Sequence, residues 1–456
     1  MQDTAILIPT LLSAIFVLLY TTERAFLSIY IPVLLLIPQI FVVKVSGLPE
    51  FTIGQMAIIP VAIGAFIKCF WRWRFSVMDF LVVGYIIVCT YSEYINLGFS
   101  PAQNILANML TTVYAPYYIT KGLLHSAKLS VKFAKRLVFL VFISVLISLY
   151  EFRFVTNLFI SIPGMFFPFQ GGTTWPALYR WGFVRIGGPY AQPIFMGMMV
   201  GVAILFNYWL WKSKFWKSNF FVLPRLPLSK GAIITWVLFF GVAATFSRAP
   251  FAGLVMGGLL MHVGYSSHRM RGLLTVLILS LFFVIYSYES YSYYSAVNPY
   301  MANSEAESNA AYRAQLTREY ILVAQKNNEW GWGRNHWPKM TGMKSIDNEY
   351  LWLWLEHGII ALGLLLAIMA WVSIRLIHRG MNNPRKYHID NSFIFALLGA
   401  IFSIEISLLT VYMGLQIEPV FFMLVGWAEG YLIRSNQHHT LQDEAEEEGC
   451  IPKSVT

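Results

Sequence analysis

Long runs of apolar residues, separated by short polar connections, dominate the chain. A helix needs about 20 mainly apolar residues, within a range of about 17–25, to cross the hydrocarbon core of a membrane. The candidate spans are 5–20, 25–43, 53–70, 77–97, 102–123, 137–160, 189–211, 231–247, 251–265, 272–288, 350–374, 392–413 and 417–433. The first is short and the last contains Glu418 and Glu429. The pattern therefore predicts an all-α polytopic membrane protein with about 12–13 transmembrane helices.

The composition supports the same class. Apolar residues make up 57% of the chain and charged residues 12%, whereas an ordinary soluble domain has roughly 45–50% and about 25%. A surface that faces water needs more charge, which excludes a soluble enzyme, a disordered protein and a disulfide-stapled secreted domain. Cys69, Cys89 and Cys450 have no metal-ligand spacing. Residues 5–20 lack the basic start and cleavage site of a signal peptide, so we expect them to form a span.

The 33 basic residues outnumber the 23 acidic ones, which gives a formal charge of +10. About two thirds of them fall in every second connection between the predicted spans, and by the positive-inside rule these connections face the cytoplasm. The clusters are Lys68, Arg72 and Arg74; Lys121, Lys128, Lys132, Lys135 and Arg136; Lys212, Lys214, Lys217, Arg225 and Lys230; Arg269 and Arg271; and Arg375, Arg379, Arg385 and Lys386. Orientation in a lipid bilayer thus explains most of the surplus, and nucleic acid is not an expected partner. A polar, acidic cytoplasmic tail, 435–456, ends the chain.

The opposite, extracytoplasmic side receives the segment 289–349, the longest connection in a membrane domain that covers 1–434. Within it, the second half of 303–328 has the pattern of an amphipathic helix. A turn-rich sequence follows, Gly-Trp-Gly-Arg-Asn-His-Trp-Pro, which contains Arg334 and His336. Loops of this length are usually functional or disordered, and the Tyr and Trp content of this one argues against disorder.

Two arginines stand at predicted helix starts on the extracytoplasmic side. Arg248 follows Thr245-Phe-Ser and precedes the 251–265 span, whereas Arg185 precedes Ile-Gly-Gly-Pro and the 189–211 span. Free N–H groups at a helix start favour anions, and guanidinium groups bind phosphate oxygens in bidentate fashion. The two positions together favour a phosphate site at the membrane surface. The alternative is that both arginines anchor span ends by snorkelling.

A carboxylate also stands on this side. Asp347 lies directly before the 350–374 span, where it is a candidate base or, alternatively, the N-cap of the helix. Glu349, Glu356 and His336 are rival candidates for the base. Glu356 lies two turns into the span, where it is equally expected to be a buried hydrogen-bonding residue.

The sequence Asp347-Asn348, nine residues, then Gly358-Ile-Ile-Ala361 resembles a signature of the O-antigen ligase and polysaccharide polymerase superfamily. That signature closes the large periplasmic loop and enters the next span. In ligases it is a histidine, then Asn, Ser or Gln, nine residues and Gly-x-x-Gly. Asp347 stands at the histidine position and Ala361 at that of the second glycine. Polymerase-type members are more permissive there, so the chain resembles a polymerase of lipid-linked repeat units more than a ligase.

Three further elements resemble the same superfamily over roughly residues 180–375. Arg185 with Ile-Gly-Gly is similar to its Arg-x-x-Gly element, and Thr-Phe-Ser-Arg248 is similar to its Thr-x-Ser-Arg element. Arg313, ahead of the Gly-Trp-Gly turn, is similar to the family's arginine before a Gly-x-Gly turn. The order and sidedness of these elements make the resemblance more specific than any one of them.

The resemblance implies an inverting glycosyltransferase that polymerises undecaprenyl-diphosphate-linked oligosaccharides outside the cytoplasm. Arg185 and Arg248 would hold the diphosphate and stabilise its developing charge, and Asp347 would accept or orient the proton of the acceptor hydroxyl. The residues expected to bind substrate are Arg313, Asn348, Glu349, Arg334 and His336. No metal and no cofactor is expected, because the arginines supply the positive charge.

We accordingly expect a protein of the bacterial inner membrane with its active site facing the periplasm or exterior. The resemblance also implies a chain-length regulator and a flippase of the same pathway as partners. One alternative is an O-antigen ligase, which transfers the glycan to a lipid or another acceptor. Another is a transporter or flippase, although such proteins tend to show paired halves with broken helices, which this sequence lacks. A non-catalytic scaffold has no reason to place arginines at two outer helix starts.

Overall fold

The computed structural model describes residues 7–43, 49–166, 176–216, 229–298, 301–302, 304–340, 346–384, 387–414 and 416–435. The predicted acidic tail beyond Ser435 and the basic residues Lys217, Arg225, Arg385 and Lys386 lie outside these ranges. Within them the chain is almost entirely helical, which confirms the predicted all-α class.

The helices follow one another with short connections. The first set is α2 (Ile8–Leu19), α3 (Thr22–Ala25), α4 (Ile31–Leu36), α5 (Ile53–Cys69), α6 (Val77–Leu97), α7 (Phe99–Met109), α8 (Ala115–Leu123), α9 (Ala127–Phe154) and α10 (Leu158–Phe166). The second set is α11 (Pro193–Lys212), α12 (Lys230–Ala244), α13 (Arg248–Tyr265), α14 (Arg269–Ser295), α15 (Glu305–Lys326), α16 (Glu349–Asn382), α17 (His388–Ser407) and α18 (Ile417–Ser435). Short turns of π- or 3₁₀-helix are η1 (Phe26–Tyr30), η2 (Phe70–Arg72) and η3 (Leu110–Tyr114). Two antiparallel pairs of strands complete the fold: β1 (Val42–Val43) with β2 (Phe51–Thr52), and β3 (Leu178–Arg180) with β4 (Phe183–Arg185).

Seven of the described helices are long and apolar enough to cross a membrane. They are Ile53–Arg72, Val77–Leu97, Ala127–Phe154, Pro193–Lys212, Arg269–Tyr294, Glu349–Asn382 and His388–Ser407. Each of the other predicted spans contains a shorter helix or a run of consecutive helices. The expectation of a polytopic membrane protein is therefore confirmed.

Two predicted spans are interrupted. The segment 25–43 begins at the last residue of α3 and contains η1 and α4. Its helix ends at Leu36, so the predicted span is too long. The segment 102–123 is divided by η3, after which Pro116 lies in the first turn of α8. Proline has no N–H to continue the helical hydrogen-bond ladder, which accounts for a change of helix type at this point.

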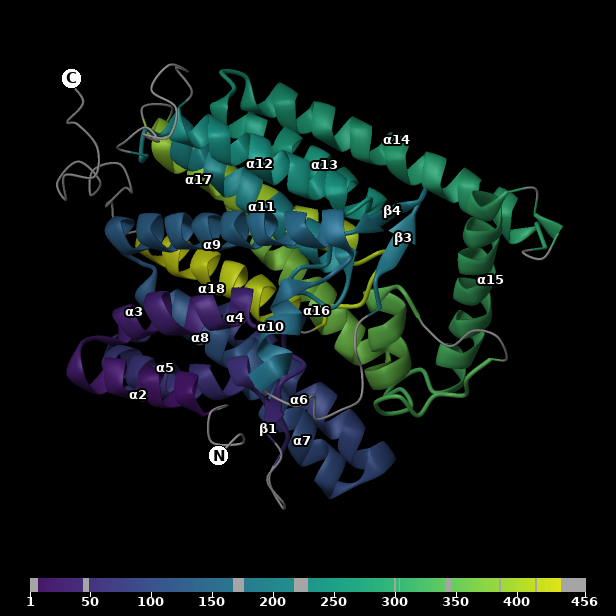
Figure 1. Cartoon of the computed structure of the whole chain (residues 1–456), viewed down its shortest axis with the longest axis horizontal. Helices are drawn as coiled ribbons and strands as arrows, with labels where there is room; N and C mark the ends of the chain where they lie inside the picture. Colours follow the sequence, from purple (N-terminus) through teal and green to yellow (C-terminus); the bar gives the residue numbers. More distant parts are fainter. Residues whose placement is uncertain are drawn as a thin grey trace.

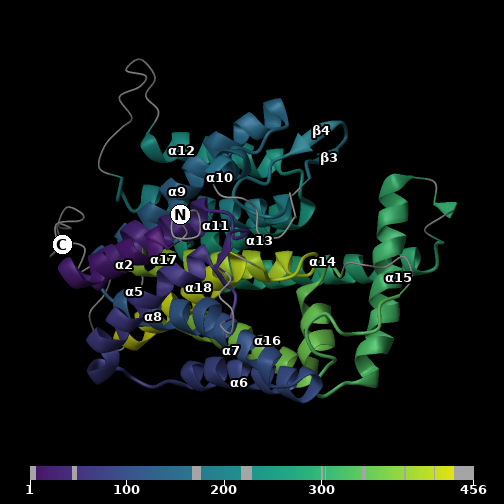
Figure 2. The ribbon, with the colours of Figure 1, turned by 60° about the horizontal axis from the view of Figure 1, so that its bottom comes forward.

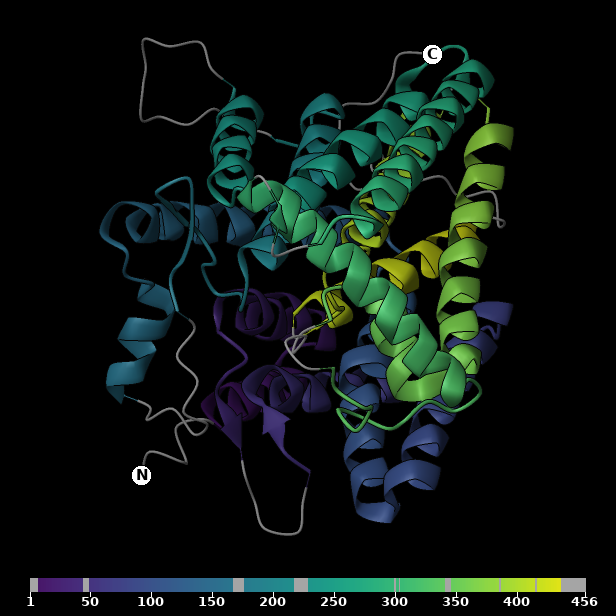
Figure 3. The same ribbon diagram turned by 90° about the vertical axis from the view of Figure 1, so that its right-hand side faces the viewer.

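The predicted loop 289–349 contains more helix than expected. α14 continues to Ser295, and α15 begins at Glu305 rather than in the second half of 303–328. Ser304 caps α15 by accepting a hydrogen bond from the N–H of Glu307. Most helices lie along the length of the molecule, whereas α15 stands across one end of the bundle (Figures 1 and 2). Viewed toward that end, α15 crosses the face of the molecule diagonally (Figure 3).

Two pairs of opposite charges lie inside the bundle. Glu429, which weakened the case for the last predicted span, is fully buried on α18. The guanidinium of Arg375 on α16 donates to both of its carboxylate oxygens, at 2.7 and 2.5 Å. Close by, Lys121 on α8 donates to Asp79 on α6 at 2.5 Å. A charge without a partner would be costly in an apolar interior. The pairing therefore allows these charged side chains to lie inside the bundle.

The helices α13 and α17 approach until their backbones touch. A Cβ atom added at Gly257 would lie 2.5 Å from the carbonyl oxygen of Gly399, and one added at Gly399 would lie 2.4 Å from that of Gly257. Small residues permit such approach between membrane helices, where close packing supplies much of the association energy. Because Arg248 is the first residue of α13, this contact also positions that arginine.

The close approach predicts that Gly257→Ala destabilises the protein. The new methyl group would force α13 and α17 apart, and overpacking of this kind costs about 1–3 kcal/mol. Gly258→Ala is the matched control, since a Cβ atom there has no heavy atom within 4 Å. Thermal unfolding of both purified variants in detergent tests the prediction. Equal stability of the two variants would contradict it.

Candidate functional site

Arg185 and Arg248 meet at one turn. The turn 245–247 joins α12 to α13, and Arg185 at the end of β4 reaches it from the neighbouring hairpin. Its Nε donates to the carbonyl oxygen of Thr245 and its Nη2 to the hydroxyl of Ser247, both at 2.9 Å. Arg248 begins α13 directly after Ser247, and its side chain is exposed. Arg185 is thus fixed to the residue that precedes the other predicted arginine.

Two more arginines lie near this turn. Arg180, on β3, donates from Nη1 to the carbonyl oxygen of Phe246 at 2.5 Å. Burial, and to a smaller extent the charges of Arg180 and Arg313, lower the pKa of the Arg185 guanidinium to about 10. Arg185 therefore keeps its charge at neutral pH in a place where like charges gather. An anion bound here would relieve that repulsion.

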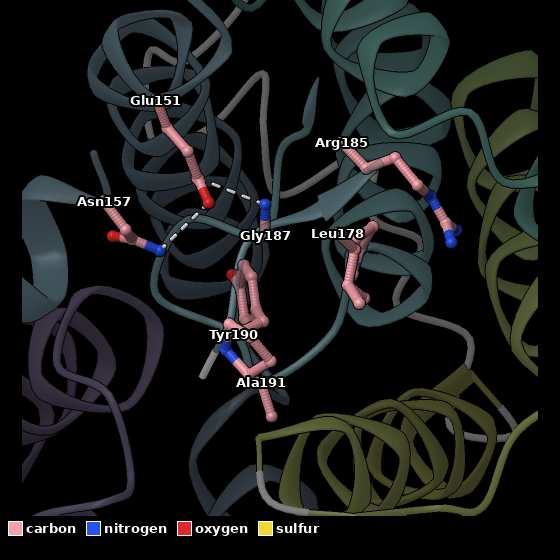
Figure 4. A pocket seen from close by; sticks show the side chains of 9 residues that line it. Glu151, Asn157, Leu178, Arg185, Gly187, Tyr190 and Ala191 are labelled. Atoms are coloured by element: carbon pink, nitrogen blue, oxygen red, sulfur yellow. Dashed lines mark hydrogen bonds between the residues drawn. The ribbon is translucent and has the colours of Figure 1, made fainter. Parts of the chain in front are cut away.

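Glu151, which the sequence did not single out, fixes the turn that follows Arg185. Its carboxylate at the end of α9 accepts hydrogen bonds from the N–H groups of Gly187 and Gly188 at 3.2 and 2.9 Å. Asn157 donates to the same carboxylate at 3.3 Å and to the carbonyl oxygen of Gly188 at 2.7 Å. Figure 4 shows the Arg185 side chain directed away from this group. Glu151 therefore fixes the backbone beside Arg185.

A small cavity of about 20 Å³ lies between Glu151, Asn157, Arg185 and Tyr190 (Figure 4). A cavity needs about 10–15 Å³ to hold one water molecule. This cavity is therefore large enough for a water molecule among the hydrogen bonds around Glu151 but too small for a sugar.

The start of α16 is anchored to the connection between α17 and α18. Asn348, not Asp347, is the N-cap: its Oδ1 accepts from the N–H of Leu351 at 3.1 Å, which corrects the N-cap alternative for Asp347. Asn348 Nδ2 also donates to the carbonyl oxygen of Leu409 at 3.2 Å. The buried carboxylate of Glu349 accepts from the N–H of Met413 at 2.5 Å. Both side chains therefore make the hydrogen bonds that hold Asp347 in place.

Asp347 is half-buried beside aromatic side chains. Burial raises the pKa of Tyr412, and the charges of Asp347 and Glu349 raise it further. Tyr412 stacks on Trp352 with a centroid distance of 5.0 Å and contacts Phe195, at the start of α11, edge-on at 5.4 Å. Asp347 thus lies within electrostatic reach of a group of stacked rings.

The connection between α17 and α18 also contacts the turn that follows Arg185. Gln416 donates from Nε2 to the carbonyl oxygen of Pro189 at 2.9 Å, and Phe195 follows shortly afterwards on α11. Residues 408–414 therefore contact the start of α16, and Gln416 contacts the turn after Arg185. The structure brings the predicted carboxylate and the predicted arginines to one end of the bundle.

A break in α16 at Gly358 shapes this end. Gly358 has φ +81°, and the backbone N–H groups of Trp332 and Gly333 donate to the carbonyl oxygens of Leu355 and Glu356 at 2.8 and 2.9 Å. Ile359, after the break, donates to the carbonyl oxygen of Asn328 at 2.7 Å. The loop 328–333 thus supplies the partners that a continuous helix would have supplied.

The remaining predicted residues lie around this loop. Arg334 and His336 are exposed. The N–H of Arg334 donates to Glu93 at 2.9 Å, while that of Asn335 donates to the buried Glu356 at 3.3 Å. Glu356 therefore has the hydrogen-bonding role that was expected as an alternative to a base. The buried His357, beside Ser92 and Glu356, was not predicted.

Residues 233–366 match the family model described as O-antigen ligase. This stretch is an O-antigen ligase family domain. No curated protein matches the chain. The O-antigen ligase domain contains Arg248, Arg313, Asp347 and Gly358, whereas Arg185 lies before it. The match supports an O-antigen ligase or polymerase type of membrane enzyme and suggests that it transfers glycosyl groups.

The geometry of the break predicts that Gly358→Ala damages the O-antigen ligase domain. Alanine is strained at φ +81°, and its Cβ atom would lie 2.0 Å from the carbonyl oxygen of Glu329. Backbone strain of this type costs on the order of 1–3 kcal/mol. Gly363→Ala is the control on the same helix, because a Cβ atom there meets no heavy atom within 4 Å. Thermal unfolding should show a lower midpoint for Gly358→Ala alone, and a shared decrease would argue against a special role for the break.

Proposed function

We propose that the protein polymerises lipid-linked oligosaccharides by inverting glycosyl transfer on the extracytoplasmic face of the membrane. The observation that carries the proposal is the turn 245–247, where Arg185 and Arg180 converge next to Arg248 in an O-antigen ligase family domain. The donor is a glycan on a polyprenyl diphosphate, for which undecaprenyl diphosphate is the expected carrier.

Arg180, Arg185 and Arg248, here called the arginine group, bind the diphosphate. Arg248 adds its charge to the start of α13, where free N–H groups and the helix dipole already favour an anion. Arg185 contributes a fixed positive charge, because its guanidinium is held by Thr245 and Ser247. When the glycosidic bond breaks, the diphosphate leaves with the electron pair, and charge placed in advance stabilises it without reorganisation.

Asp347 acts on the acceptor. The acceptor hydroxyl oxygen forms the new bond to the anomeric carbon from the side opposite the diphosphate, and its proton passes to the Asp347 carboxylate. General base catalysis of this kind contributes typically 10²–10⁴-fold. The stacked rings of Trp352 and Tyr412 offer an apolar face to the sugar. The step is complete without a metal or a cofactor.

The other predicted substrate-binding residues divide into two groups. Asn348 and Glu349 act by holding Asp347, since their side chains are engaged by Leu409 and Met413. Arg313, Arg334 and His336 are exposed near the same end of the bundle and would contact the glycan. A chain-length regulator and a flippase of the same pathway remain expected partners in the bacterial inner membrane.

A ligase is the second candidate, because the matching family model is described as O-antigen ligase. Asp347 in place of the ligases' histidine favours the polymerase. The two differ in the acceptor, which is another lipid-linked glycan for a polymerase and a different lipid or glycan for a ligase.

The decisive experiment incubates the purified protein in detergent with a polyprenyl-diphosphate oligosaccharide. We expect longer glycans and released polyprenyl diphosphate, because transfer needs no closed compartment. Absence of any transfer, together with movement of the substrate across vesicles, would instead support the transporter. Products formed only after a separate lipid acceptor is added would identify a ligase.

Variants in that assay test the assigned residues. Arg248→Ala should lower turnover by about 10²–10³-fold, the usual loss for one preorganised charge-stabilising group. Asp347→Asn should lower it by about 10²–10⁴-fold, because its size is kept and its basicity is lost. Arg153→Ala is the control, since this exposed arginine lies at the end of α9 and outside the proposed site. Full turnover of Asp347→Asn would transfer the base role to Glu349, Glu356 or His336.

A further inference from the structure

A second, larger cavity lies at the other end of α9. Its volume is about 770 Å³, within the range of about 300–1,000 Å³ that is usual for ligand pockets. Among the described residues, six cationic side chains and one carboxylate, that of Glu23, line it. The cationic residues are Arg24, Lys68, Lys132, Lys135, Arg136 and Lys230.

These cations come from separate parts of the chain. Arg24 lies on α3, Lys68 at the end of α5, three of the others on the first turns of α9, and Lys230 at the start of α12. The positive-inside rule accounts for basic residues in connections on one side of a membrane. It gives no reason for them to surround one cavity, where their mutual repulsion is unfavourable unless an anion is bound.

An ordered aromatic ring forms part of the cavity wall. Trp216 donates from its indole N–H to Asn207 at 3.0 Å, which fixes its orientation. The ammonium groups of Lys230 and Lys135 lie 5.1 and 5.8 Å from its ring centroid. Cations near an aromatic face are attracted to it, so Trp216 holds two lysines at the cavity.

The lining is amphipathic. Leu27, Leu129 and Phe139 lie in the same wall as the cations, and Phe139 is 42% exposed. Glu23 forms an ion pair with Lys68, and among the described lining residues cationic side chains outnumber carboxylates six to one. A ligand that suits this wall carries phosphate at one end and hydrocarbon at the other.

The cavity is distant from the proposed transfer site. Lys132 and Glu151 both lie on α9, nineteen residues apart, which corresponds to about 28 Å at a rise of about 1.5 Å per residue. This is close to the thickness of the hydrocarbon core, about 30 Å. A lipid in the cavity therefore belongs to the opposite leaflet from the donor and is not the substrate.

We infer that this cavity binds the headgroup of an anionic phospholipid of the cytoplasmic leaflet, with acyl chains along Leu27, Leu129 and Phe139. Basic pockets between membrane helices on that side suit anionic headgroups. The inference does not depend on the proposed glycosyl transfer.

Native mass spectrometry of the full-length protein in detergent tests the inference, with added phosphatidylglycerol and, as a neutral reference, phosphatidylcholine. We expect preferential retention of phosphatidylglycerol. The variant Lys132→Gln/Lys135→Gln/Arg136→Gln should bind it at least about tenfold more weakly, since each basic residue near a charged lipid surface contributes roughly a fivefold effect. The matched control is Lys128→Gln/Lys212→Gln/Arg271→Gln, which removes three basic residues of the same side that do not line the cavity.

Two results would overturn the inference. One is an equal loss in both triple variants, which would indicate a general effect of charge. The other is full competition by glycerol phosphate at the same concentration as the lipid, which would indicate a site for a free anion. If the triple variant unfolds, Lys132→Gln alone replaces it, because Lys132 is exposed. Roughly fivefold weaker binding is then expected, and unchanged binding would refute the inference.

Discussion

Backbone hydrogen bonding in apolar surroundings is the constraint on which this architecture depends. A polar backbone group without a partner is costly there, so a helix can be broken only where other protein groups replace the lost bonds. Gly358 interrupts α16, and the loop 328–333 takes over the carbonyl oxygens of Leu355 and Glu356 and the N–H of Ile359. The extracytoplasmic segment is therefore joined to the membrane helices by the hydrogen bonds that α16 itself requires. The first part of α16 begins beside Asp347. It can point in a different direction from the rest of the helix only because this loop is present.

Hydrogen bonds to the backbone also hold the arginine group. Arg185 and Arg180 donate to the turn 245–247, and Glu151 holds the backbone after Arg185. Flexible side chains become fixed charges in this way, and fixed charges stabilise a leaving diphosphate better than mobile ones. The backbone beside Asp347 is held by a different set of contacts, from Asn348 to Leu409 and from Glu349 to Met413.

The sequence predicts the features that depend on local pattern. Apolar runs locate the helices, because spanning length is a property of consecutive residues, and the positions of Arg185 and Arg248 follow from the ends of those runs. Features that depend on distant partners were not predicted. Glu151 is an ordinary glutamate near a helix end until Gly187 and Gly188 are folded against it. The hairpin β3–β4 has little sequence signal, since most of its residues are exposed. Asp347 was the predicted alternative for the N-cap of α16, and only the three-dimensional structure shows that the adjacent Asn348 caps the helix.

The family-matched segment and the arginine group do not have the same boundaries. Residues 233–366 include Arg248, Arg313 and Asp347 but not Arg185, Arg180 or Glu151. A chimera that exchanged only this segment between two such proteins would combine one parent's carboxylate and helix-start arginine with the other parent's hairpin. The natural unit of exchange is longer: it begins at the end of α9, so that each arginine remains with the backbone that holds it.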